Sequence, residues 1–318
     1  MSSEVDVVTL GETMALLHSL QPGRLDLASL LGVSVGGAES NTAIGLSRLG
    51  VATRWIGRVG ADAFGERVLR TLRAESVDVV GVVDPGASTG LMVKERRSST
   101  QTSVTYYRSG SAGSRLTPTD LPAGVIESAR VLHVTGITPA LSPSARDTVD
   151  HALRRARDAG VKVALDVNHR SRLWDASTAR PVYRELVEAS DIVFAGVDEA
   201  ALLLDTDESD PHALAEMLTR LGPSEAIIKS GSEGADAVCD GRRLHVDALA
   251  VDVVDTVGAG DAFVAGYLAE RLAGAETEIC LRTAAAAGAF ACTSPGDWES
   301  LPTRSDLLSL TALDPVSR

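Results

Sequence analysis

The chain has 318 residues, 44% of them hydrophobic, and a formal net charge of −13 at pH 7. This length suits one large α/β domain or two average domains. Because no run of Lys and Arg stands out in this acidic chain, we expect neither nucleic acid nor an anionic membrane surface as a partner.

Cysteine use and the N-terminal sequence both favour a cytoplasmic protein. Cys239, Cys280 and Cys292 are odd in number and show no metal-ligand spacing, which fits a reducing compartment. The first residues lack the basic region and long apolar core of a signal peptide, and no apolar run is long enough to span a membrane. We therefore expect the chain to stay in the cytoplasm.

The predicted elements follow an alternating order along the chain. A short apolar run at residues 5–10 predicts a buried strand, and helical spacing at residues 62–75 predicts a helix that Asp62 can cap. Further on we expect strands at residues 131–135, 161–167, 192–195 and 226–229, and helices at 144–158, 178–188 and 211–221. Strands alternating with helices predict a mainly parallel sheet that is covered on both faces.

One region breaks this alternation. Residues 90–97 and 102–108 are two extended runs joined by a polar turn at 98–101, which predicts an antiparallel hairpin acting as a small lid. Side chains two apart on a strand share a face, so Tyr106 and Arg108 can present an aromatic ring and a guanidinium to one ligand. A guanidinium is well shaped to hold a carboxylate. On the local pattern alone, an ordinary surface arginine is the simpler interpretation.

Polar residues at 166–170 follow the apolar run at 161–165, at the end of a predicted parallel strand, where ligands usually bind in open α/β sheets. Asp166, Asn168 and Arg170 alternate, so they can converge if the strand continues. A routine exit from strand to loop explains the same residues equally well. The sequence alone leaves both interpretations open.

Two glycine-rich segments are weaker signals. Gly36 and Gly37 precede a helical pattern and allow a ligand to approach the backbone, although plain turns use such pairs more often. Residues 229–234 follow a strand and can border a nucleotide, but they contain no P-loop or dinucleotide fingerprint. A hairpin turn toward residues 235–239 is the simpler account there. The six histidines are scattered without a His-x-x-x-His pair, so we do not expect them to bind a metal.

The loop at residues 255–261 carries the strongest chemical signal. Gly258, Ala259 and Gly260 precede a buried helical pattern, whose first turn offers unpaired N–H groups and the positive end of the helix dipole. Such a terminus suits a phosphate, and the glycines let it come close. Asp261 would repel that phosphate, unless it takes a proton from the group that attacks it. The loop therefore predicts phosphoryl transfer.

Together these segments resemble the ribokinase-like (PfkB) carbohydrate kinases over almost the whole chain. The motifs that carry the resemblance lie at residues 36–50, 57–60, 62–65 and 255–261, and those at 106–112, 136–141 and 166–174 are most similar to the 2-keto-3-deoxygluconate kinases. The resemblance implies a single three-layer α/β/α domain over residues 1–318 with a mainly parallel central sheet. It also implies a small β lid formed by segments at about 12–37 and 89–110.

The resemblance implies roles for particular residues. Asp261 matches the general base that deprotonates the primary hydroxyl of 2-keto-3-deoxygluconate, giving the 6-phosphate, and Gly258, Ala259 and Gly260 match the anion hole. Sugar-contacting positions are matched by Gly36, Gly37, Asn41, Tyr106, Arg108, Arg170 and Asp297. ATP-facing positions are matched by Asn168, Lys229, Ser230, Gly231, Ser232, Glu233, Gly234, Gly258 and Gly260.

The implied cofactors are ATP and Mg²⁺, with a monovalent cation such as K⁺ as a further candidate, and Glu199 matches a position in the Mg–phosphate network. A homo-oligomer formed through the lid is also implied. Two positions depart from the family pattern: Gly196 replaces an asparagine, and Met92 stands where an aromatic residue is common.

Two arginines beside the pocket of an acidic protein lead to the hypothesis that Arg108, Arg170 or both hold a sugar carboxylate. The alternatives are a kinase for 2-keto-3-deoxygalactonate, fructose or ribose, and a sugar or nucleotide sensor without catalysis. The intact Asp261 counts against the sensor.

Overall fold

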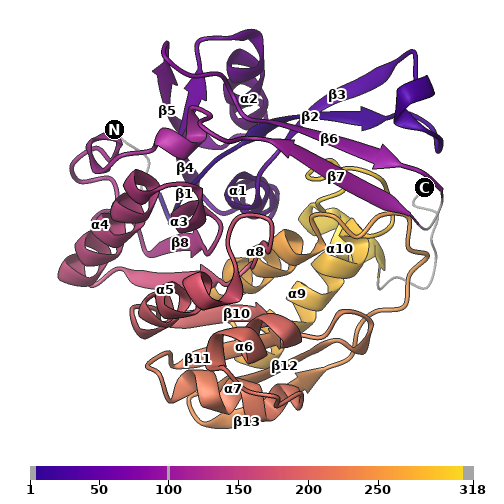
Figure 1. Cartoon of the computed structure of the whole chain (residues 1–318). Helices are drawn as coiled ribbons and strands as arrows, with labels where there is room; N and C mark the ends of the chain where they lie inside the picture. Colours follow the sequence, from indigo (N-terminus) through magenta and orange to yellow (C-terminus); the bar gives the residue numbers. More distant parts are fainter. Residues whose placement is uncertain (1–4, 99–100, 311–318) are drawn as a thin grey trace.

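The computed structural model describes residues 5–98 and 101–310 and shows a layered α/β architecture (Figure 1). Within those residues the main sheet has nine strands in the order β13-β12-β11-β10-β9-β8-β1-β4-β5. From β11 to β5 all neighbours are parallel, whereas β12 and β13 are antiparallel additions at one edge. The strands are β1 (Val7–Leu10), β4 (Thr53–Gly60), β5 (Asp78–Asp84), β8 (Val131–Thr135), β9 (Lys162–Asp166), β10 (Ile192–Gly196), β11 (Glu225–Lys229), β12 (Ala235–Cys239) and β13 (Arg242–Val246).

Helices cover both faces of this sheet because successive strand residues point to opposite sides. Val8 and Leu132 pack with helices on one face, whereas Val7 and Ile227 pack with helices on the other. The first face holds α4 (Pro143–Ala159), α5 (Ala176–Glu188), α6 (Val197–Leu204) and α7 (Pro211–Thr219). The second face holds α1 (Ala38–Arg48), α2 (Ala63–Ala74), α8 (Ala259–Leu272) and α9 (Thr277–Ala291). The remaining helices are the short α3 (Thr138–Leu141) and α10 (Arg304–Leu310), with single 3₁₀ turns η1 (Leu25–Leu27), η2 (Gly113–Arg115), η3 (Pro118–Asp120) and η4 (Gly231–Glu233).

The predicted strands and helices are confirmed, with ends displaced by one or two residues. The cap of α2 is also confirmed, because the Asp62 carboxylate accepts the Gly65 N–H at 2.8 Å. Among the described residues, no helix is both long and apolar enough to cross a membrane.

A second sheet, which we call the lid sheet, extends from the main sheet (Figure 1). Its four strands within the described residues have the order β3-β2-β6-β7, formed by β3 (Leu31–Gly36), β2 (Met14–Ser19), β6 (Leu91–Arg96) and β7 (Thr102–Tyr107). Strands β6 and β7 are the predicted antiparallel hairpin, whose turn includes residues 99 and 100 outside the described residues. Met14, Leu16 and Met92 form a small core on one face, whereas most of β7 is exposed.

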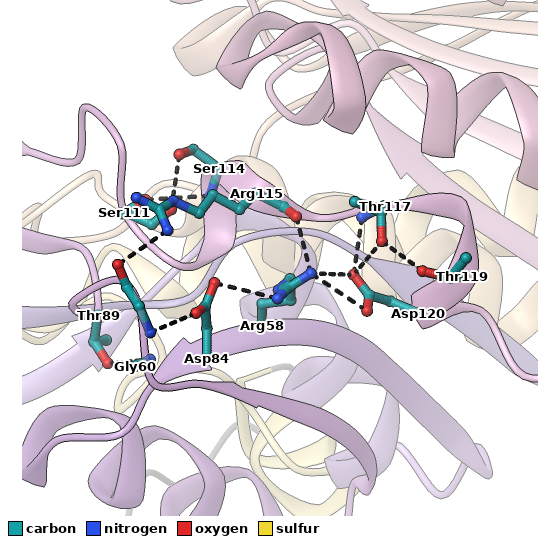
Figure 2. A network of polar contacts seen from close by, with 11 residues as sticks. Arg58, Gly60, Asp84, Thr89, Ser111, Ser114, Arg115, Thr117, Thr119 and Asp120 are labelled. Atoms are coloured by element: carbon teal, nitrogen blue, oxygen red, sulfur yellow. Dashed lines mark hydrogen bonds and ion pairs between the residues drawn. The ribbon is translucent and has the colours of Figure 1, made fainter.

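A polar network fixes the base of the lid sheet to the main sheet (Figure 2). Arg58 on β4 forms ion pairs with Asp84 at 3.2 Å and Asp120 at 3.1 Å, and it donates to the Arg115 carbonyl at 3.1 Å. Arg115 in turn donates to the carbonyl of Gly86 at 3.0 Å. Arg58 on the central sheet therefore holds the segment that follows β7, and Arg115 in that segment holds the one that precedes β6.

Candidate active site

A cavity of about 390 Å³ lies where the carboxyl ends of the parallel strands face the lid sheet. Its volume lies within the usual range for small-molecule sites, about 300–1,000 Å³. The ends of β9 and β11 and the loop after β9 contribute Asp166, Asn168, Arg170 and Lys229, and the lid sheet with the residue after β7 contributes Met92, Lys94, Tyr106 and Arg108. The 255–261 loop and its helix add Thr256, Val257, Gly258, Gly260 and Asp261, and the lining also includes Glu12, Glu39, Asn41, Glu199 and Asp297.

Asp261 lies in the first turn of α8 and is buried. The Asn41 side-chain amide donates to its Oδ2 at 2.8 Å, so α1 and α8 meet at this carboxylate. Burial raises the pKa of Asp261 to about 7, and the nearby Asp166 adds to the rise, while the Asn41 hydrogen bond, Arg170 and Lys229 act against it. A carboxylate with a pKa near neutrality suits a general base at physiological pH.

The loop before Asp261 needs glycine for a steric reason. Gly258 has φ 81°, and a Cβ there would lie 2.1 Å from the Asp297 backbone oxygen. Gly258 and Gly260 line the cavity, whereas the Ala259 N–H donates to the Thr256 carbonyl at 3.3 Å. The two glycines are therefore the better-placed members of the predicted anion hole.

On the lid side, Arg108 is held by a buried carboxylate. Its guanidinium contacts Glu12 Oε2 at 2.6 and 2.7 Å, and Ser111 donates to the other carboxylate oxygen of Glu12. Strand β7 ends at Tyr107, one residue before the predicted end, so Arg108 directly follows the strand. The guanidinium nevertheless lies 5.7 Å from the Tyr106 ring centroid, and both side chains line the cavity.

Arg170, unlike Arg108, is not paired with a carboxylate of the described residues. It is exposed and lines the cavity, and it donates to the His169 carbonyl at 3.3 Å. Of the two arginines predicted to meet the substrate, Arg170 therefore has the free charge.

Asp166, Asn168 and Arg170 do line one cavity, but not along a continuing strand. Strand β9 ends at Asp166, and Asn168 takes a left-handed conformation with φ 43°. Lys229, at the end of β11, approaches the two Asp166 oxygens at 2.8 and 2.9 Å. Burial works to lower the pKa of Lys229, but Asp166 and Glu199 outweigh it and the pKa is raised. This lysine therefore remains a cation inside the cavity.

The other residues of the 229–234 segment lie outside the cavity lining. Ser230, Gly231, Ser232, Glu233 and Gly234 form the turn between the antiparallel strands β11 and β12, and the cavity lining includes Lys229 but none of these five. Their contact with a nucleotide stays a prediction.

Glu199 lines the cavity while capping α6. Its two carboxylate oxygens accept the N–H of Gly196 at 2.7 Å and of His169 at 2.8 Å. Because the Gly196 contribution is a backbone N–H, the missing asparagine side chain does not disturb this contact.

The described residues contain no group of three His, Cys, Asp or Glu side chains arranged for a metal ion. Mg²⁺ commonly keeps several waters and uses one or two carboxylates together with phosphates, so Asp166 and Glu199 fit a metal that arrives with ATP.

The lid sheet and the C-terminal loop meet at Gly36, which does not itself line the cavity. A Cβ at Gly36 would lie 2.4 Å from Met92 Cε and 2.6 Å from Asp297 Oδ2, and a Cβ at Gly37 would lie 2.3 Å from the Glu12 backbone oxygen. Close packing therefore requires both glycines. Burial raises the pKa of the Asp297 carboxyl to about 6, and Lys94 partly offsets this effect.

Sequence reasoning missed three charged residues of the lining: Glu12, Glu39 and Lys94. Glu39 is buried, accepts hydrogen bonds from Thr135 at 2.7 Å and Thr138 at 2.6 Å, and has its pKa raised by burial. Lys94 alternates with Met92 on β6, so the face rule applied to Tyr106 and Arg108 could have found it. Glu12 follows β1 without any comparable signal.

Residues 5–304 match the pfkB family carbohydrate kinases, and the chain belongs to that family. It is 38% identical to the 2-dehydro-3-deoxygluconokinase of Bacillus subtilis, over 96% of this chain and 95% of that protein. It is 32% identical to the 2-dehydro-3-deoxygalactonokinase of Haloferax volcanii, over 92% of each. A putative ribokinase II from Escherichia coli, solved with ATP and Mg²⁺, is 25% identical with a TM-score of 0.89, over 96% of this chain and 98% of that one. The protein is therefore an ATP-dependent sugar kinase with a ribokinase-like fold.

Proposed function

We propose that this kinase phosphorylates the primary hydroxyl of 2-keto-3-deoxygluconate, the 2-dehydro-3-deoxygluconate of its relatives' names. The observation that carries the proposal is the free guanidinium of Arg170 in the same cavity as the buried Asp261. A neutral sugar has no group to pair with that charge, whereas a sugar acid does. Recognition of a carboxylate by arginine through paired hydrogen bonds is strong and directional.

The reaction follows from the positions of these groups. Asp261 takes the proton of the sugar hydroxyl while the hydroxyl oxygen attacks the γ-phosphorus of ATP. The bond between that phosphorus and the bridging oxygen breaks, and ADP leaves. The positive end of α8 and the backbone at Gly258 and Gly260 stabilise the charge on the transferring group. Bound Mg²⁺ would neutralise phosphate charge, and Asp166 and Glu199 are the carboxylates that would hold it.

The lid sheet has two roles in this proposal. Its face with Met92, Tyr106 and Arg108 covers the sugar and excludes water, which favours transfer to the sugar over hydrolysis. The surface of the lid sheet that faces away from the cavity, where Tyr107 is 64% exposed, supports the expected homo-oligomer.

A cytoplasmic location remains the expectation from the scattered cysteines, all three of which are free thiols in the structure.

A coupled ADP-release screen tests the proposal across 2-keto-3-deoxygluconate, 2-keto-3-deoxygalactonate, fructose and ribose. We expect the highest kcat/KM with 2-keto-3-deoxygluconate and a 6-phosphate product by phosphorus NMR. Preference for a neutral sugar would reject the acid-sugar assignment while leaving the kinase intact. Absence of ADP release with every sugar would favour the sensor.

A further inference from the structure

Lys229 is a cation inside the cavity that is held by a buried carboxylate. It is the last residue of β11, and 19% of its side chain is exposed. Its Nζ donates to Asp166 Oδ1 at 2.8 Å and to Asp166 Oδ2 at 2.9 Å, and the Asp166 side chain is only 2% exposed. The ion pair therefore fixes the position of the ammonium at the end of the sheet.

One N–H of this ammonium is left over. A lysine ammonium has three donors and no acceptor. Two of them go to the two oxygens of Asp166, and among the described residues the third has no protein partner. An anion in the cavity can therefore accept this third N–H without breaking the ion pair.

The same ammonium lies against the loop that is expected to bind phosphate. A Cβ placed on Gly260 would lie 3.6 Å from Lys229 Nζ. Gly260 belongs to the first turn of α8, where backbone N–H groups are unpaired and the helix dipole is positive. Because Lys229 and Gly260 both line the cavity, the side-chain donor and the backbone donors of α8 can reach one phosphoryl group.

The charges of the lining also call for a cation here. The carboxylates of Asp166, Glu199 and Asp261 line the cavity, and each of them repels an entering phosphate. Bound Mg²⁺ would offset part of this repulsion, and the Lys229 ammonium adds a further positive charge beside Gly260. Lys229 is therefore placed to stabilise negative charge on a group that is transferred at this loop.

We propose that Lys229 is a catalytic residue, which donates its third N–H to the phosphoryl group during transfer. The ammonium keeps its proton throughout, while the phosphorus–oxygen bond to ADP breaks and the bond to the sugar oxygen forms. Asp166 holds the ammonium in position for this contact. The inference rests on the proposed function, in which the 255–261 loop receives the transferring group.

The kinetic test compares the wild type with Lys229→Met and Lys229→Arg. Removal of one donor to the charge that develops in a transition state costs about 10²- to 10³-fold in kcat, and Lys229→Met should lose that factor. The KM of the sugar should change little, and Lys229→Arg should recover part of the loss because it keeps the charge. Lys162→Met is the matched control, since its ammonium is exposed and pairs with Asp191 away from the cavity.

A second measurement needs neither sugar nor turnover. Calorimetric titrations with Mg²⁺ compare ADP with AMP-PNP, a non-hydrolysable ATP analogue that carries a terminal phosphoryl group. Loss of one charge-assisted hydrogen bond should weaken the binding of AMP-PNP to Lys229→Met by about tenfold or more, and the binding of ADP should stay nearly unchanged. A wrong assignment of the sugar would leave this difference between the nucleotides intact.

Lys229→Met also leaves the buried Asp166 carboxylate unpaired, which destabilises the fold. If this variant does not fold, the titrations compare Asp166→Asn with the double variant Asp166→Asn/Lys229→Met. Both lack the carboxylate charge, so the comparison isolates the ammonium. The double variant should discriminate less between AMP-PNP and ADP than Asp166→Asn does.

Three results would overturn the proposal. Wild-type kcat in Lys229→Met would show that the third N–H is not needed. Equal losses of affinity for ADP and AMP-PNP would show that Lys229 only supports the cavity wall. A loss confined to the KM of the sugar acid would show that the ammonium pairs with the sugar carboxylate instead of the phosphoryl group.

Discussion

The two sides of the cavity carry their positive charges in different states. On the lid side, Glu12 neutralises Arg108, and Asp255 and Asp297 neutralise Lys94, all in buried ion pairs. On the sheet side, Lys229 is also paired, with Asp166, whereas Arg170 is exposed and pairs with no carboxylate of the described residues. The paired charges therefore hold the walls of the cavity in place, whereas the charge of Arg170 is available to a ligand.

This difference sharpens the original hypothesis about the two arginines. Arg108 already gives two of its donors to Glu12, and breaking that buried ion pair would leave the Glu12 carboxylate uncompensated. Arg170 has no such constraint. We therefore propose Arg170 as the main partner of the sugar carboxylate, with Arg108 held beside Tyr106 by Glu12.

The largest expected effect is that of Asp261→Asn. General-base assistance is worth about 10²- to 10⁴-fold, so kcat should fall by that factor at saturating ATP and sugar. Turnover within a few-fold of the wild type would contradict the role of Asp261 as base.

The same substitution should stabilise the fold at pH 8. Burial raises the pKa of Asp261 from an ordinary value of 3.8 to about 7, so the folded state holds this proton more tightly than the unfolded state. Ionisation of Asp261 therefore lowers stability as pH rises between those two values, and the neutral amide avoids this loss. The melting temperature of Asp261→Asn should exceed that of the wild type at pH 8, with a smaller difference at pH 4.

The next effect is that of Arg170→Met on the sugar acid. Loss of a charge-assisted hydrogen bond costs about 1.5–3 kcal/mol, which corresponds to roughly 10- to 150-fold in kcat/KM. The neutral sugars should be affected little. Arg184→Met, an exposed arginine paired with Glu188 on α5, serves as the control. An equal loss on acid and neutral sugars would remove the carboxylate argument.

Arg108→Met should act differently because it disturbs the lid. Freed from its partner, the buried Glu12 destabilises the base of β7, and kcat/KM should fall by a similar factor for acid and neutral sugars. The double variant Glu12→Gln/Arg108→Met should recover part of the stability lost by the single variant. A loss confined to the sugar acid would assign the carboxylate to Arg108.

The smallest effect concerns the pH profile. Below about pH 7, kcat/KM should fall about tenfold per pH unit as Asp261 becomes protonated. The Asn41 hydrogen bond lowers the pKa of Asp261, so Asn41→Ala should move this acid limb to higher pH. A limb that stays in place or moves to lower pH would contradict the assignment of the titrating group.

Much of the fold and the centre of the site could be predicted from the sequence. Hydrophobic periodicity and caps such as Asp62 are local, so they located the strands and helices. The loop before Asp261 could be interpreted because a helix terminus and its glycines act over a few residues. The sequence left open whether the strand continues through Asn168 or ends before it, and the structure ends it at Asp166, with Asn168 in a left-handed conformation.

The ion pairs could not be predicted for a different reason. Glu12 and Arg108 are separated by 96 residues, and Lys94 and Asp255 by 161. A single sequence shows charges but not which of them meet, so Arg108 and Arg170 looked equivalent. Only the packing of the lid sheet against the main sheet separates the occupied guanidinium from the free one.

The most direct test of the central claim combines one change in the protein with one in the substrate. Wild type and Arg170→Met are each assayed with 2-keto-3-deoxygluconate and with its C1 carboxamide. If Arg170 holds the carboxylate, the two changes are coupled: each should cost about 10- to 150-fold alone, and the second should cost little after the first. Losses that simply multiply would show that Arg170 and the carboxylate do not interact, which would contradict the account.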